Sequence, residues 1–268
     1  MRNHLLPLGV TLVMIGAAAC SEGTTGTVSL AVSTAHPAGA PLASAALGIS
    51  TAPQVVTAGD STVITLGNDT IILRSIEVVL REIELKRVEA DSCDSVMGND
   101  DCDEFETGAV LATLPLGNVA TETIIAVDAP AGMYDELEFK IHKPSSSDDA
   151  AFIAAHPGFD GVSIRVSGTY SNAGTRSDFV FTSDLEAEQE IEFAPPITVS
   201  EGSGTSVTLR VDVSSWFLNG AGSALVDPAT ANKGQANEGV VKDRIQASID
   251  AFRDDDHDGH DDDDPDDH

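Results

Sequence analysis

The chain has 268 residues, a formal net charge of −30 at pH 7 and an aromatic content of only 4%. Its length suffices for one large or two small domains with a real hydrophobic core. A chain this acidic is repelled by phosphate backbones, which argues against nucleic-acid binding and favours cations or basic protein surfaces as partners.

The first 19 residues have the parts of a secretory signal. Arg2 lies in a basic start, an apolar run extends from Leu5 to Ala19, and small residues lead directly into Cys20. This order of basic, apolar and small residues is typical of a cleaved signal. The run is also shorter than the roughly 20 apolar residues that span a bilayer. An ordinary signal with a chance cysteine remains the alternative.

Because Cys20 follows Ala17-Ala18-Ala19, the segment resembles a bacterial lipoprotein signal with its lipobox. The resemblance implies removal of residues 1–19 and acylation of Cys20. Several acyl chains would anchor the protein stably, since each buried CH₂ contributes about 0.8 kcal/mol. Ser21 is compatible with export to the outer membrane, because lipoproteins kept in the inner membrane usually carry Asp there. We therefore expect an outer-membrane lipoprotein of the cell envelope, facing the periplasm or the outside.

Residues 20–60 are expected to hold the lipidated cysteine, a tether, a first strand and a loop. Ser21–Gly26 is polar and flexible in composition, as tethers are. Residues 27–33 alternate polar and apolar side chains, which predicts a half-buried strand. Residues 34–53 are rich in Ala, Pro, Gly and Ser and predict a loop.

Residues 61–253 are expected to complete one β domain, because strand-like runs recur about every ten residues with Gly, Pro or Asn turns between them. A helix competes for 74–88, but its β-branched residues and alternating end favour a strand. A short helix is expected near 149–156, and a second over 239–252 with Asn237 as its cap. The predicted strands are 61–66, 70–88, 109–116, 120–127, 133–142, 161–170, 175–183, 188–193 and 205–213.

The expected fold class is therefore an all-β, antiparallel β-sandwich with a short C-terminal helix and a disordered acidic tail over 254–268. Three segments resemble a family of bacterial surface β-sandwich domains of unknown function (DUF4382-like). They are Gly26–Leu30, Ile76–Glu84 and Pro130–Leu137, and the resemblance covers roughly residues 26–145. It implies an envelope lipoprotein without assigned catalysis. The acidic segment over 89–106 and the acidic tail are not part of the family pattern.

Cys93 and Cys102 lie in a loop over 89–106 that holds eight acids and no Lys or Arg. An exported protein meets an oxidising compartment, so we expect these two cysteines to form a disulfide. A metal-bound thiol pair is the rival, although the spacing does not match that of Cys-x-x-Cys zinc sites. The acids of this loop are interpreted as a solvated surface, with Ca²⁺ binding as the alternative.

The tail over 254–268 holds ten Asp and no Lys or Arg, and its beginning has the spacing of a calcium loop. Such loops place carboxylates at positions 1, 3 and 5, a Gly at 6, a carbonyl at 7 and an acid at 9. Pro265 stands where the full loop has a bidentate Glu, so Ca²⁺ would bind weakly. A solvated low-complexity tail and loose Zn²⁺, Ni²⁺ or Cu²⁺ binding through its His residues are the alternatives. The candidate metal residues are Asp254, Asp256, Asp258, His260 and Asp262.

Catalytic motifs are missing from the sequence: it has no Gly-x-Ser-x-Gly, no His-Glu-x-x-His and no phosphate-binding loop. His142 and His156 are interpreted as surface or turn residues, and Trp216 as a core residue. The expected function is non-enzymatic binding or structural support on a lipid anchor, with an envelope or extracellular protein as a further partner. A scavenger of divalent metals and a hydrolase with an unrecognised site remain the alternatives.

Overall fold

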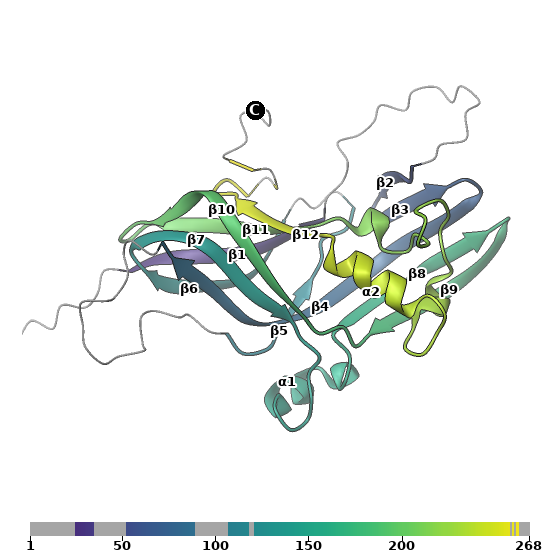
Figure 1. Ribbon diagram of the computed structural model, residues 1–268, viewed down its shortest axis with the longest axis horizontal. Helices are drawn as coiled ribbons and strands as arrows, with labels where there is room; N and C mark the ends of the chain where they lie inside the picture. The colour runs from purple at the N-terminus through teal and green to yellow at the C-terminus, as the bar shows by residue number, and fades with distance from the viewer. Residues whose placement is uncertain are drawn as a thin grey trace, which may run out of the picture.

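The computed structural model describes residues 25–34, 52–88, 107–117, 121–257, 259 and 261–262. Within these ranges it is built of strands in two sheets, together with short helices (Figure 1). The strands are β1 (Thr25–Thr34), β2 (Gln54–Ala58), β3 (Ser61–Leu66), β4 (Asp69–Arg87), β5 (Val110–Thr113), β6 (Glu122–Pro130), β7 (Gly132–Ile141), β8 (Ile164–Asn172), β9 (Thr175–Ser183), β10 (Ala187–Val199), β11 (Gly204–Val211) and β12 (Ile249–Arg253). The helices are α1 (Ala150–Ala155) and α2 (Glu238–Gln246), with 3₁₀ turns η2 (Pro157–Phe159), η3 (Val213–Ser215) and η4 (Pro228–Ala231).

Sheet A has four strands in the order β12-β11-β1-β6. β1 and β11 are parallel, from Thr27 opposite Gly204 to Thr34 opposite Val211, and the other neighbours are antiparallel. Alternation sends Leu30 and Val207 into the core, where they line the same small apolar pocket as Ile83, Leu85 and Leu137 of the opposite sheet. The outer face is polar in sequence, with Ser206 and Thr208, yet both of these side chains are buried. A polar segment of the chain must therefore cover the outer face of sheet A at Ser206 and Thr208.

Sheet B has eight strands arranged around the 19-residue β4. One side of β4 pairs first with β3 and then with β5, and the other side pairs first with β8 and then with β7. β10 extends the sheet beyond β7, and β9 extends it beyond β8. The part formed by β2, β3, β8, β9 and the first half of β4, here called the wing, projects away from sheet A (Figure 1).

The wing is covered by α2 and the irregular chain before it rather than by sheet A (Figure 1). Phe217 makes edge-on ring contacts with Phe179 and Phe181 of β9, with centroids 6.0 and 5.4 Å apart. Trp216 is fully buried, and its indole N–H donates to Ser248 Oγ at 2.8 Å. A buried indole needs such a partner, so Trp216 is a core residue, as predicted.

β4 is interrupted by a bulge at Glu82, whose φ is +51°. The register between β4 and β7 shifts between Arg81 and Glu84, and the Glu82 amide donates instead to the carbonyl of Thr107 at 3.0 Å. A non-glycine residue in the left-handed region costs of order 1–3 kcal/mol, so the surroundings must hold this conformation. Bulges of this kind re-aim side chains, and the residues around Glu82 form one of the candidate sites below.

The all-β sandwich expected from the sequence is confirmed, and residues 74–88 belong almost entirely to β4 rather than to a helix. The helix expected over 239–252 is shorter than predicted. It ends at Gln246, and the chain turns so that residues 249–253 pair with β11 as β12. Asn237 stands at the helix start, but its side chain donates to Thr230 Oγ1 and does not cap the helix.

Candidate functional site

The residues singled out from the sequence are only partly placed by the structure. Cys20, Cys93 and Cys102 lie outside the described residues, as do Asp258 and His260. Acylation and the disulfide therefore stay predictions. Asp254, Asp256 and Asp262 are described, and they lie in a segment that folds onto sheet A.

Asp254 is fully buried at the point where β12 ends. Its backbone N–H donates to the Ser206 carbonyl, which extends the pairing with β11 by one residue. Its carboxylate Oδ2 accepts from the Thr208 hydroxyl at 2.7 Å and from the Gly259 amide at 3.2 Å. Hydrogen bonds to a charged group contribute about 1.5–3 kcal/mol, so Asp254 fastens the C-terminal segment to the buried polar face of sheet A.

The segment after Asp254 closes into a loop. Gly259 has a φ of +84°, which a glycine adopts without strain. The amide of Asp255 donates to Asp262 Oδ2 at 2.7 Å, and the amide of Asp262 donates to the Arg253 carbonyl at 3.0 Å. The two ends of residues 253–262 are therefore joined by hydrogen bonds.

Three further contacts carry this loop across sheet A. Asp255 Oδ1 accepts from the Ser206 amide at 3.0 Å, and His257 Nδ1 lies 3.2 Å from Ser206 Oγ. The His257 carbonyl accepts from Thr121 Oγ1, just before β6. The segment thus crosses from β12 to the opposite edge of the sheet, and the fold continues past residue 253, where the sequence placed the end of the domain.

As a metal site this loop is incomplete in the part of the chain that the structure places. No group of three or more His, Cys, Asp or Glu among the described residues is arranged around a common point. Asp254 is turned toward Thr208, Asp262 toward the Asp255 amide, and Asp256 is exposed. The amide of the glycine at position 6 donates to the carboxylate at position 1, so these two positions of the calcium-loop spacing lie close together.

A second polar cluster lies beside the Glu82 bulge. His142 Nε2 is 2.8 Å from Asp149 Oδ2, and both side chains are largely buried, with 15% and 5% of their surfaces exposed. Arg81 Nη1 lies 3.7 Å from the other carboxylate oxygen of Asp149, and the Ser145 amide donates to Oδ2. The interpretation of His142 as a surface or turn residue is therefore wrong as regards the surface, because its side chain is only 15% exposed and contacts a buried acid seven residues later.

Electrostatics keep Asp149 ionised. Burial raises the pKa of Asp149. The hydrogen bonds from His142 and the Ser145 amide, together with the positive charge of Arg81, outweigh burial and hold that pKa below its usual range. Nearby, Lys140 is hydrogen-bonded to Glu82, which lowers the pKa of the Glu82 carboxyl. The cluster is thus a network of paired charges around a strained residue.

A groove of about 230 Å³ opens next to this pair, lined by Lys140, Ile141, His142, Glu186, Ala187 and Glu188. A His–Asp pair acts as a general base when the second ring nitrogen faces a hydroxyl, a thiol or a water. Among the residues described, no Ser, Thr or Cys side chain is hydrogen-bonded to His142. The structure therefore places a His–Asp pair beside a groove, with no hydroxyl or thiol of the described residues hydrogen-bonded to the imidazole.

No family model matches the chain, and comparison with curated proteins and with solved structures likewise gives no match. The resemblance to bacterial surface β-sandwich domains therefore stays a prediction. In the described part of the chain, no helix combines the length and apolar character needed to cross a bilayer.

Proposed function

We propose that this protein is a lipid-anchored β-sandwich of the bacterial cell envelope, held at the outer membrane by acylated Cys20, with a non-enzymatic binding or structural role. The proposal of an anchor is supported by the Ala17-Ala18-Ala19-Cys20 sequence after the apolar run. Mass spectrometry of the N-terminal peptide tests it. A fatty-acylated peptide beginning at Cys20, absent from a Cys20→Ala variant, is expected, and an unmodified cysteine would refute the anchor.

We further propose that the C-terminal acidic loop binds one Ca²⁺ weakly. The observation that supports this is the contact between the Asp254 carboxylate and the Gly259 amide, with Gly259 at positive φ. This turn brings positions 1 and 6 of the calcium-loop spacing together, and Asp262 at position 9 is held close by the Asp255 amide. Ca²⁺ prefers six to eight oxygen ligands, so carboxylates and waters would complete the shell.

Calorimetric titration of the chain from Ser21 onward with Ca²⁺ tests this role. We expect saturable binding of about one ion, lost in Asp256→Asn and retained in Asp243→Asn, a matched change of an exposed acid on α2. Several weak sites for Ca²⁺, Zn²⁺ and Ni²⁺ would instead indicate a metal scavenger. No saturable binding would leave the loop with its structural contacts alone.

The His142–Asp149 pair supports a second candidate function, a hydrolase that activates a water or a substrate hydroxyl at the groove. Its test is turnover of chromogenic esters and glycosides by the wild-type chain and by His142→Ala. Activity that is lost in His142→Ala but kept in His156→Ala would favour this candidate. Equal turnover by all three proteins would reject it.

A further inference from the structure

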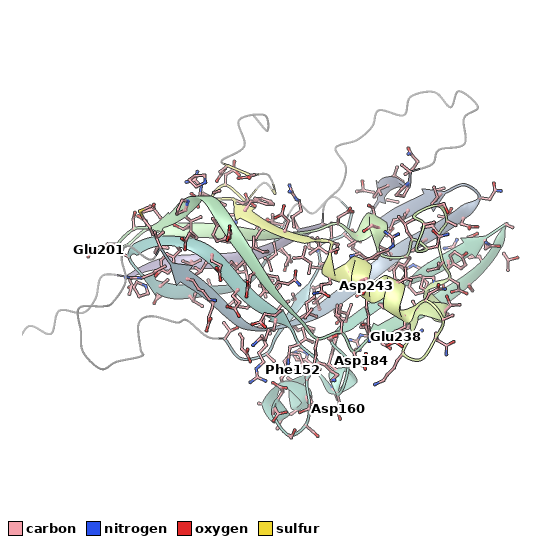
Figure 2. The ribbon with its side chains drawn as sticks, viewed as in Figure 1. Phe152, Asp160, Asp184, Glu201, Glu238 and Asp243 are labelled. Atoms are coloured by element: carbon pink, nitrogen blue, oxygen red, sulfur yellow. The ribbon has the colours of Figure 1, made fainter. Side chains whose placement is uncertain are left out.

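The first residue of the sandwich lies at one end of the molecule. Thr25 begins β1, pairs with Pro130 at the end of β6, and its carbonyl accepts from the Gly202 amide at 3.0 Å. Figure 2 places Glu201, next to Gly202, at the end of the molecule opposite the wing. We call this the anchor end. It comprises the start of β1, the β6–β7 turn, the β10–β11 turn and the end of β4.

The distance available between lipid and fold is short. Only residues 21–24 separate Cys20 from Thr25, so even a fully extended chain reaches about 17 Å. β4 begins at Asp69, at the tip of the wing, and ends at Arg87, at the anchor end. Its 19 residues correspond to about 60 Å of strand. The tether is therefore far shorter than the molecule, and the wing tip cannot reach the headgroups unless the whole domain lies flat.

Charge opposes that flat arrangement. The net charge of −30 repels an anionic leaflet over the Debye length of about 8 Å at physiological salt. An end-on arrangement brings a smaller part of this acidic surface near the leaflet, although the anchor end itself carries exposed Asp128 and Glu201 beside Met133, which is 42% exposed.

We propose that the anchor end faces the bilayer and that the wing, with its exposed Val56 and Val180, points away from it. This inference rests on the proposed acylation of Cys20. It assigns the surface available to an envelope partner: the wing and α2 face away from the membrane, while the β6–β7 and β10–β11 turns face the headgroups.

Fluorescence quenching by headgroup-labelled lipid tests the orientation in the acylated full chain. A probe is attached through Glu201→Cys at the anchor end or through Asn68→Cys in the β3–β4 turn at the wing tip, both exposed positions. Each variant carries Cys93→Ser and Cys102→Ser, so that the probe is the only reactive thiol once Cys20 is acylated. The vesicles contain phosphatidylethanolamine with an anionic lipid.

Quenching at residue 201 is expected to exceed that at residue 68 about threefold, because a tether of about 17 Å is attached at one end of a domain whose longest strand, β4, has a contour of about 60 Å. Insertion of about 24 Gly/Ser residues after Ser21 lengthens the tether by roughly 25 Å or more and should remove most of the difference. Equal or reversed quenching in chains that float with the vesicles would overturn the orientation alone. Chains that do not float would instead refute the anchor itself.

Discussion

Asp254→Ala should detach the C-terminal segment from sheet A. The substitution removes the acceptor of two donors, the buried Thr208 hydroxyl and the Gly259 amide. A buried donor left without a partner costs about 1–3 kcal/mol, and Gly259 is half-exposed, so water replaces part of its loss. We expect a loss of about 2–3 kcal/mol, which for a folded part of this size lowers the melting temperature by about 5–10 °C.

The assay is urea and thermal unfolding of the chain from Ser21 onward, in the presence of a chelator so that metal binding does not contribute. Asp243→Ala is the matched control, since it removes an exposed carboxylate on α2, outside the C-terminal segment, and should change stability by no more than about 0.5 kcal/mol. Hydrogen exchange at the Ser206 amide, which donates to Asp255, reports local detachment of the segment. Equal unfolding curves and unchanged exchange at Ser206 in both variants would refute a structural role for Asp254.

Three other predictions concern the cover of the wing and the sheet beneath it. Hydrogen bonds from Lys233 and Lys242 hold the pKa of the Asp184 carboxyl well below its usual range. The ionised carboxylate therefore contributes its full stabilisation above about pH 4, and this stabilisation is lost as the pH falls through the lowered pKa. Lys242→Met should therefore flatten the acid limb of a plot of urea midpoint against pH below about 4, and an unchanged slope would contradict this linkage. Trp216→Ala should cost about 3–5 kcal/mol in urea unfolding because it empties a fully buried site, and a cost below 1 kcal/mol would show that the site is not close-packed. Gly168→Ala places a Cβ 2.1 Å from the Ile72 carbonyl oxygen and should destabilise the protein strongly. In Gly239→Ala, on α2, the new Cβ meets nothing within 4 Å, so this substitution should stabilise the protein by up to about 1 kcal/mol. Thermal melts that reverse this order would count against the packing of β8 on β4.

Periodicity was sufficient to predict most of the sheet. In β4 the alternating end around Ile83 and Leu85 distinguishes a strand from a helix, and both side chains are buried as that alternation requires. It failed for the C-terminal helix, because Val241, Ile245, Ile249 and Phe252 fit a helical spacing although the last two lie on β12. β11 offers an edge there, and pairing with it satisfies backbone groups that a longer helix would have satisfied internally.

The candidate sites depend on contacts that no local pattern contains. Ser206 and Thr208 alternate with apolar residues, a pattern that predicts a solvated outer face. The Ser206 amide and the Thr208 hydroxyl also supply the hydrogen bonds that a carboxylate needs in order to be buried on this face. A run of Asp is solvated unless such a surface lies opposite it, and only the fold brings Asp254 and Asp255 to β11. The His142–Asp149 pair arises in the same way, through a turn that folds a buried acid back onto the end of β7. Polar residues on the outer face of a sheet therefore indicate that the face contacts either water or a polar segment of the chain. In this protein the acidic segment that begins at Asp254 covers that face and accepts hydrogen bonds from β11.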